Sequence, residues 1–497
     1  MAVPVDEVPV LERARGAGAR ESWAEAYALL READLHPSAA LGPNDLDVLA
    51  DAAWWTGRVD ESVAARLRAQ AGYAAAGDRR GAGRAAWWLA YAYRRMGRPA
   101  AAAGWLHRAR HLLEEASDGP EQCYPAWSDA EEAQAHHDPA AALAAARRME
   151  RAARRSGSPD LIAQSLRVHA AVLLVNGRRA RGLALLDEAM GPVTAGALSG
   201  LTTGRLYALA LTHCLQAADL PRAMRWTDAA MAWCSSPGPP PAPEGGGVGA
   251  GRVVNPFRGV CRVRRVEVLD LLGEWGLAEA EAGRACAEVL PDEAEAAAAA
   301  HYAAGEIRRR QGRLDDAVMA YSHAHDLGRV PQPGLALLRL AQGRTDAAVA
   351  GLRLAEACRE VPLHDLLGRA GLLAARTEVA LAVGDPADAA RAAAELTALA
   401  DGAPLLVAMA GTARGALALA LGEPALPTLR RALARWRELP VPYGTARARM
   451  LLAAAERAAG DEEAARRQLT AARSTFEALD AVPDAARAAA RLGEAGA

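Results

Sequence analysis

The chain has 497 residues, of which 52% are hydrophobic but only 4% aromatic, and alanine supplies most of the apolar positions. All 58 basic residues are arginine, which excludes a Schiff-base lysine and the phosphate-binding lysine of a Walker loop. The net charge of −2 does not mark the chain as a nucleic-acid binder. Because alanine favours helix and strand-favouring runs are nearly absent, we expect an all-α fold.

The sequence also points to a cellular compartment. Residues 1–10 carry Asp6 and Glu7 and lack the basic and apolar regions of a secretory signal. No stretch of uncharged apolar residues is long enough to span a membrane. The 6 cysteines are widely spaced without a C-x-x-C motif, which is typical of reduced thiols. We therefore expect a cytoplasmic protein that has no membrane contact, metal or cofactor.

Short turns between helical runs recur from one end of the chain to the other. Where glycine follows a helical run, it can adopt the left-handed conformation that ends a helix. The first turns are about 40 residues apart, a period that indicates stacked helical hairpins. The pattern predicts a single α-solenoid over residues 9–497, a right-handed superhelix of about twelve hairpins, with turns near Gly18, Gly57, Gly97, His137, Gly177, Ala218, Gly273, Gly312, Gly343, Gly384, Gly422 and Gly460.

Acidic residues follow several of these turns. A carboxylate at the start of a helix can accept hydrogen bonds from free amide groups and stabilise the positive end of the helix dipole. The sequence predicts this role for Asp60, Asp315, Asp346, Asp385 and Asp461.

The unit around Gly312 resembles a tetratricopeptide repeat. Gly305 precedes the turn, and Ala317, Tyr321 and Ala324 follow it, at the small and aromatic positions of that repeat. The resemblance implies helical hairpins of the tetratricopeptide type, lengthened to fit the longer period.

Residues 235–256 interrupt the repeats with the sequence SSPGPPPAPEGGGVGAGRVVNP. Proline and glycine at this density cannot continue a helix, so we expect a flexible insertion between repeats. Its glycines do not indicate a nucleotide-binding loop, because no predicted strand precedes them.

Several phrases resemble the helical-repeat region of actinobacterial LuxR-type transcriptional regulators, which are maltose-regulator-like. They lie at residues 52–58, 77–90, 331–340, 436–449 and 472–479. In that family a helix-turn-helix follows the repeats, and many members begin with an ATPase module. This chain ends at Ala497 and has no lysine for an ATPase loop. We therefore expect a sensor or scaffold portion without either module, and no direct DNA binding.

Aromatic residues are concentrated in the first third of the chain. Neighbouring side chains on a helix diverge by about 100°, so the two rings of a Trp-Trp pair cannot share one contact. One ring of each pair can pack between repeats while the other lines a groove. Core packing alone is the favoured explanation of these rings. If some of them bind a ligand, the candidate residues are Trp54, Trp55, Trp87, Trp88, Tyr91 and Tyr93.

Other groups of polar residues have simpler explanations. His107 and His111 share a helix face but have no obvious third metal ligand, so histidines that are solvated or packed between repeats are expected. The arginine pairs and the run 308–310 are interpreted as solvated helix faces, with an arginine-lined groove for an acidic peptide or carboxylate as the alternative. No nucleophile stands beside a suitable base, and we expect no enzyme activity.

These observations predict a non-catalytic regulatory or scaffold protein that binds a protein partner, a peptide or a small-molecule effector in a concave groove. The resemblance to LuxR-type regulators implies a link to transcription or signalling. The alternatives are a stand-alone interaction adaptor unrelated to transcription and, less favoured, an enzyme with its site in the helical groove.

Overall fold

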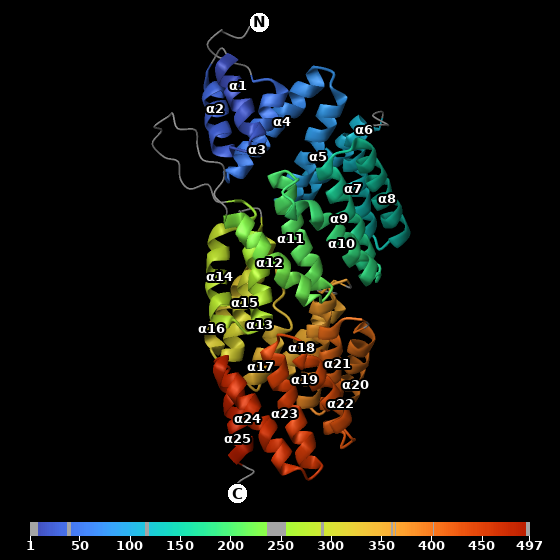
Figure 1. The fold of residues 1–497 in the computed structure, drawn as a ribbon, viewed down its shortest axis with the longest axis vertical. Helices are drawn as coiled ribbons and strands as arrows, with labels where there is room; N and C mark the ends of the chain where they lie inside the picture. Colours follow the sequence, from blue (N-terminus) through green and yellow to red (C-terminus); the bar gives the residue numbers. More distant parts are fainter. Residues whose placement is uncertain are drawn as a thin grey trace. The chain divides into compact units, whose positions relative to one another are not determined.

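The computed structural model describes residues 8–36, 41–114, 119–235, 255–289, 293–358, 361–362, 364–400 and 402–493. These residues form 25 α-helices and one short 3-10 helix, with no strand among them (Figure 1). The all-α prediction is confirmed. No helix in this part of the chain is long and apolar enough to cross a membrane.

The helices follow one another as hairpins, each made of an odd-numbered first helix and an even-numbered second helix. The first half of the chain contains α1 (Val8–Ala19), α2 (Trp23–Leu35), α3 (Pro43–Trp55), α4 (Val59–Ala75), α5 (Arg79–Arg95), α6 (Pro99–Leu113), η1 (Pro120–Gln122), α7 (Cys123–Ala135), α8 (Pro139–Ser156), α9 (Pro159–Val175), α10 (Arg179–Thr194), α11 (Gly200–Gln216) and α12 (Leu220–Ser235).

The second half continues the pattern and ends with an unpaired helix. It contains α13 (Arg258–Leu272), α14 (Trp275–Glu288), α15 (Ala294–Gln311), α16 (Leu314–Asp326), α17 (Gly334–Ala341), α18 (Thr345–Ala357), α19 (Leu366–Ala382), α20 (Pro386–Leu399), α21 (Pro404–Ala420), α22 (Leu426–Arg437), α23 (Pro442–Ala458), α24 (Glu462–Ala478) and α25 (Val482–Gly493).

The predicted turns are where the hairpins bend. From Gly57 to Gly460, every predicted turn residue has a positive φ, including His137 at 56° and Ala218 at 53°. The turn predicted near Gly18 is present three residues further on, because Gly18 lies inside α1 and the left-handed residue is Glu21. A Cβ on Gly18 would lie 2.8 Å from Val48 Cγ1, so this glycine permits close helix packing instead.

The hairpin of α15 and α16 shows why the repeat pattern has small and aromatic positions. Gly305 faces the ring of Tyr321, and a Cβ at Gly305 would lie 2.6 Å from that ring. Ala317 and Tyr321 are buried together with Leu338 of the next hairpin. The chain is therefore an α-solenoid of tetratricopeptide-like hairpins, as the sequence predicts.

Helix capping follows the prediction only in part. Asp385 and Asp461 each accept a hydrogen bond from an amide three residues further on. The capping prediction for Asp60, Asp315 and Asp346 is wrong, because an arginine occupies the N-cap position of each helix. Each carboxylate nevertheless lies within the first turn, where it meets the positive end of the helix as predicted.

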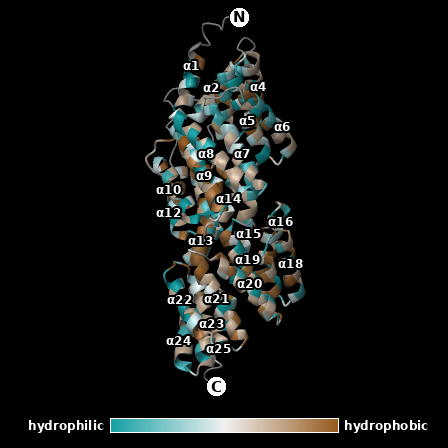
Figure 2. Cartoon of the chain, turned by 90° about the vertical axis from the view of Figure 1, so that its right-hand side faces the viewer, coloured by the Kyte–Doolittle hydropathy of each residue, from teal (hydrophilic) through white to brown (hydrophobic). Residues whose placement is uncertain are grey.

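The core is built mainly from alanine, which lets neighbouring helices approach closely. One cluster of α5 to α9 buries nine alanines around Trp87, Trp127 and Met149. Figure 2 shows hydrophilic and hydrophobic residues on the same helices, as expected where each helix buries one face.

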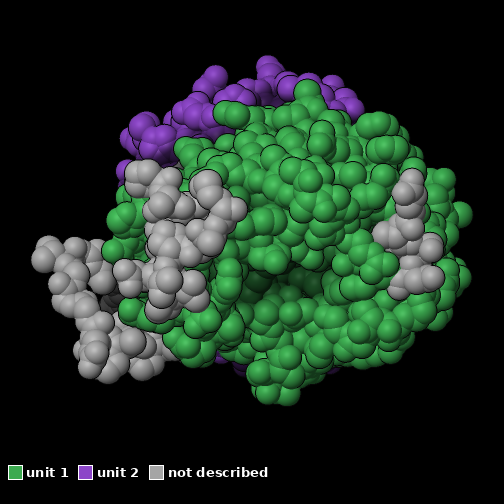
Figure 3. Space-filling view, turned by 90° about the horizontal axis from the view of Figure 1, so that it is seen from above, with its two compact units in different colours: residues 1–210, 229–259, 288–293 green, residues 211–228, 260–287, 294–497 purple. Residues whose placement is uncertain are grey.

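The chain divides into two compact units (Figure 3). Unit 1 comprises residues 1–210, 229–259 and 288–293, and unit 2 comprises residues 211–228, 260–287 and 294–497. A single solenoid over residues 9–497 stays a prediction. The predicted insertion at 235–256 lies almost wholly outside the described residues, which omit 236–254.

Candidate ligand-binding cavity

Unit 2 contains a cavity of about 1010 Å³, at the upper end of the range typical of small-molecule sites. Its helical lining comes from the first helices of successive hairpins, α11, α13, α15, α17, α19, α21 and α23, and from α25. Of the second helices, only α22 and α24 contribute, through Trp436 and Phe476. The cavity is therefore the face that the first helices of the hairpins present together.

Helical periodicity explains how so many residues reach one space. On α15, residues at intervals of three or four place Glu295, Tyr302, Glu306 and Arg309 on one stripe. The stripes of α19, α21 and α23 are mainly apolar, and residues such as Leu405 add to this part of the lining. The remaining apolar side chains include Leu215, Leu271, Leu337, Leu381, Met409 and Met450.

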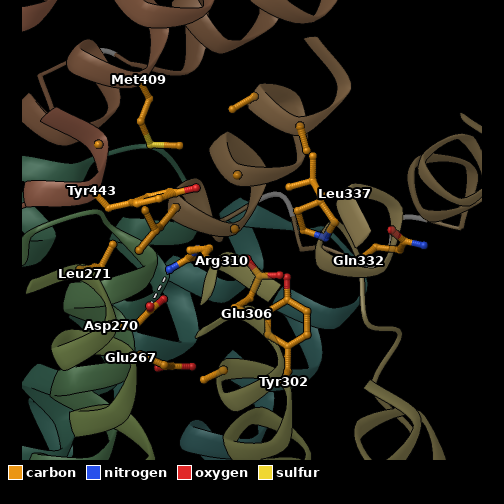
Figure 4. A pocket seen from close by; sticks show the side chains of 18 of the residues that line it. Glu267, Asp270, Leu271, Tyr302, Glu306, Arg310, Gln332, Leu337, Met409 and Tyr443 are labelled. Atoms are coloured by element: carbon orange, nitrogen blue, oxygen red, sulfur yellow. Dashed lines mark hydrogen bonds and ion pairs between the residues drawn. The ribbon is translucent and has the colours of Figure 1, made fainter. Parts of the chain in front are cut away.

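The charged part of the lining is balanced. Seven arginines and seven carboxylates of the described residues line the cavity, and most of them pair with one another. Glu306 is the centre of the largest group: it accepts bonds from Arg309 at 2.9 Å, from Arg310 at 3.1 Å and from the Tyr321 hydroxyl at 2.5 Å. Arg310 also donates to Asp270 at 2.6 Å (Figure 4).

Burial and ion pairing act in opposite directions on these carboxylates. Burial favours the neutral form of Glu306, but Arg309 and Arg310 outweigh it and lower the pKa of Glu306 to about 2. For Asp270 burial prevails over Arg310, and its pKa is raised. Glu306 is thus held as a carboxylate whose lone pairs are already used, which makes it a poor general base.

The arginines of this group were interpreted from the sequence as a solvated helix face, and for two of them this is wrong. The side chains of Arg309 and Arg310 are only 14% and 16% exposed, and both point into the charged network. Arg310 also lies over the Tyr443 ring at 5.3 Å. A second arginine–carboxylate pair, Arg447 with Glu378 at 2.7 Å, lines the cavity nearby.

Arg329 differs from the cavity arginines that pair with carboxylates. Its guanidinium lies 4.5 Å from the centre of the Tyr302 ring, and it has no ion pair with any of the described residues. Figure 4 shows Tyr302, Glu306 and Met409 around the same space. The cavity thus offers apolar surface beside an arginine that forms no ion pair with a carboxylate of the described residues.

The predicted aromatic residues lie in unit 1 and do not line this cavity. Trp55 is buried and stacks on Trp23 with ring centres 5.9 Å apart. Trp54 is half-buried and packs edge-on against Phe257. This pair acts in the packing of unit 1, and ligand binding by Trp54 or Trp55 stays a prediction.

The prediction that the two rings of a tryptophan pair cannot share one contact is wrong. Trp54 and Trp55 both contact Phe257, and Trp87 and Trp88 both contact Tyr91, because large rings on adjacent positions can reach the same neighbour.

Trp87 is 2% exposed and donates from Nε1 to the Ser128 hydroxyl at 2.9 Å. Trp88, Tyr91 and Tyr93 are half-buried. A ligand-binding role for these residues also stays a prediction.

The sequence placed Arg309 and Arg310 in a groove only as an alternative interpretation, and it did not identify the other cavity residues, although one signal was available. Glu306 and Arg308–Arg310 lie in the repeat that matches the tetratricopeptide pattern best, and a carboxylate beside three arginines could have indicated a charged network. His107 and His111 are exposed, in agreement with the expectation of solvated side chains.

Comparisons with known proteins give no family for the chain. No protein-family model and no curated protein matches it. Among solved structures, the chain is similar to one in the Cut9–Hcn1 hetero-tetramer of the APC/C, at 14% identity and a TM-score of 0.44 over 98% of this chain and 97% of that one. It is also similar to the human IFIT1 dimer with PPP-AAAA, at 14% identity and a TM-score of 0.37 over 95% of both chains.

Proposed function

We propose that the chain is a non-catalytic binding protein that takes an amphipathic ligand into the cavity of unit 2. The observation that supports this most is the lining itself, because the apolar stripes of α19 and α21 face the same space as Arg329. A small molecule or peptide with one apolar part and one carbonyl or acidic group would satisfy both surfaces.

The balance of charge also supports an amphipathic ligand over a highly charged one. The cavity carboxylates and arginines are largely paired with each other, so a polyanion would have to break these pairs to bind. The same pairing supports a binding role over an enzymatic one, because Glu306 and Glu378 are already engaged by arginine.

We further propose that binding serves regulation of transcription or signalling, as the resemblance to LuxR-type regulators implies, in the cytoplasm. The free cysteines are consistent with that compartment: four are buried, Cys286 is half-buried and Cys358 is exposed. The ligand in the same groove could instead be a protein or peptide partner. The mass spectrometry described below distinguishes such a partner from a small molecule.

Two glycines permit a test with little change to the helices. Gly371 on α19 lines the cavity, and a Cβ there would meet no atom within 4 Å. Gly276 on α14 is equally open but does not line the cavity. We expect Gly371→Trp to fill the cavity, whereas Gly276→Trp serves as the matched control.

The measurement is binding of the amphipathic dye 1-anilinonaphthalene-8-sulfonate, together with mass spectrometry of molecules that co-purify with each variant. We expect the dye and any co-purified small molecule or peptide to be lost from Gly371→Trp and kept by Gly276→Trp. Equal binding by both variants would show that the cavity is not the site.

A further inference from the structure

A second group of charged residues lies in unit 1, far from the cavity in the sequence. Arg167 on α9 and Arg205 on α11 are 5% and 8% exposed. The Arg205 guanidinium lies 4.4 Å from the Trp88 ring centre, 4.5 Å from that of Tyr91 and 5.8 Å from that of Trp127. Arg167 lies against the same Trp127 ring at 5.1 Å.

Neither arginine has a carboxylate partner among the described residues. Arg167 donates from Nε to the Gln164 amide oxygen, but its Nη2 and the Gln164 Nε2 donate no hydrogen bond within this part of the chain. Arg205 makes only contacts with aromatic rings there. Two buried arginines without a counter-charge are unfavourable, because ring faces compensate only part of the lost hydration.

The acidic residues of the same region are already engaged elsewhere. Glu131 accepts from Arg94 at 2.8 Å and from the Trp127 Nε1 at 2.6 Å. Glu150 pairs with His169 and Arg154. Glu293 pairs with Arg95. The site therefore retains an excess of positive charge.

The titration of neighbouring groups agrees with this geometry. Burial is the main reason that the pKa of Arg167 is lowered to about 10; Arg205 also lowers it, whereas Glu131 and Tyr91 raise it. Burial alone would raise the pKa of the Tyr91 phenol, but Arg205 and Arg95 outweigh burial and lower it. The lowered pKa of Tyr91 is the direction that a local positive potential produces, and a bound anion would neutralise that potential.

We propose that unit 1 binds a small oxyanion, a carboxylate or phosphate group, at Arg205, with Arg167 supplying the second positive charge. The aromatic cluster of Trp88, Tyr91 and Trp127 holds the Arg205 guanidinium in place, and the guanidinium presents the hydrogen-bond donors to the ligand. Two of the residues predicted as ligand-binding, Trp88 and Tyr91, would then act as positioning residues for Arg205. This inference is independent of the cavity in unit 2.

The test uses the full chain and two probes, inorganic phosphate and acetate, each titrated at constant ionic strength against chloride. The readouts are the thermal unfolding midpoint and the intrinsic tryptophan fluorescence, to which Trp88 and Trp127 contribute along with the other tryptophans. We expect phosphate or acetate to raise the midpoint and change the fluorescence where chloride does not. The probe with the larger effect shows whether the site prefers a phosphate or a carboxylate group.

Three variants separate specific binding from general salt effects. We expect Arg205→Met and Arg167→Met to weaken the response at least about tenfold. Without added anion, each should unfold at the same temperature as the wild type or higher, because a buried unpaired charge is removed. Arg148→Met, which removes an exposed arginine paired with Asp129, is the control and should respond like the wild type.

Arg205→Lys keeps the charge but not the planar donor group, and it carries the test if the methionine variants do not fold. We expect its affinity for phosphate to fall while some response remains. Equal responses to phosphate, acetate and chloride, or an unchanged response in Arg205→Met, would overturn the proposal. A lower unfolding temperature for Arg205→Met, without any anion effect on the wild type, would instead assign Arg205 a purely structural role and also overturn it.

Discussion

Gly334, at the start of α17, has no space for a side chain. A Cβ there would overlap the Glu306 Oε1 and the Tyr321 hydroxyl. We predict that Gly334→Ala displaces the Glu306 network and lowers the free energy of unfolding by roughly 1–3 kcal/mol. Chemical denaturation measures this change.

Gly283 provides the control for that variant. It is an exposed glycine inside α14, and a Cβ there would meet no atom within 4 Å. Gly283→Ala should therefore raise stability by about 0.5–1 kcal/mol through helix propensity. If Gly334→Ala behaved like Gly283→Ala, the contact between Gly334 and Glu306 would have no energetic role.

Glu306 gives a prediction about acid stability. Its pKa falls from 4.5 in the unfolded chain to about 2 in the folded chain, so the folded state binds fewer protons. The resulting stability is present in full above about pH 4.5 and is lost as the pH falls towards 2. At about 1.4 kcal/mol per pH unit, the contribution is roughly 3 kcal/mol.

The measurement is denaturant unfolding of the wild type and of Glu306→Gln between pH 2 and pH 7. We expect the variant to be less stable at neutral pH, with a difference that shrinks as the solution becomes more acidic. Glu463→Gln, at a surface residue paired only with Arg467, is the control and should show little change. A difference that stays constant with pH would refute the assignment of Glu306.

The sequence predicts little about the environment of individual side chains. Arg309 and Arg310 look like members of a solvated arginine run, and only the contact of α15 with neighbouring helices reveals that they are buried. Arg167 and Arg205 are 38 positions apart in the sequence and meet only through the Trp127 ring. Local patterns carry no information about such contacts between hairpins.

The helical hairpin is the scale at which the sequence was most informative. The turn residues recur because each hairpin must end its first helix with a left-handed residue, a requirement that is local and therefore visible. The left-handed conformation is present even where the turn residue is His137 or Ala218 instead of glycine. The cavity could not be predicted in this way, since its lining comes from helices α11 to α25 together.

The turn at His137 supports a prediction for this element. His137 has a φ of 56°, which costs free energy for a residue with a Cβ, and its side chain is exposed. We expect His137→Gly to raise the free energy of unfolding by about 0.5–1 kcal/mol.

The neighbouring residue is the matched control. His136 has a φ of −86° and forms a side-chain hydrogen bond to the Glu132 carbonyl. His136→Gly should therefore lower stability by about 0.5–1 kcal/mol. Thermal and chemical unfolding of both variants measure the two changes, and a loss of stability in both would contradict a strained turn at His137.

For the whole molecule, the division into units predicts the result of a cut within residues 235–256. From the sequence, this Pro- and Gly-rich segment should be the first site of cleavage. Each unit contains segments from both sides of the cut. In unit 1, Phe257 packs against Trp54, and in unit 2, Arg265 pairs with Asp228 at 2.7 Å.

We therefore expect limited digestion with proteinase K to give two fragments that stay together. Mass mapping locates the first cut, and size-exclusion chromatography under native conditions shows whether the fragments co-elute. Digestion in denaturant, followed by the same chromatography, is the control for separation. An earlier cut elsewhere, or fragments that elute separately under native conditions, would contradict the prediction.

The position of Phe257 also affects how the protein forms during translation. Its ring lies 5.3 Å from that of Trp54, 5.9 Å from that of Trp55 and 6.2 Å from that of Trp233, and all three tryptophans are synthesised before it. The ion pair of Arg95 likewise cannot form until Glu293 has been synthesised. A nascent chain that has reached only residue 235 thus presents uncovered tryptophan rings. On the ribosome, unit 1 can complete its packing only after the early helices of unit 2 have also been made.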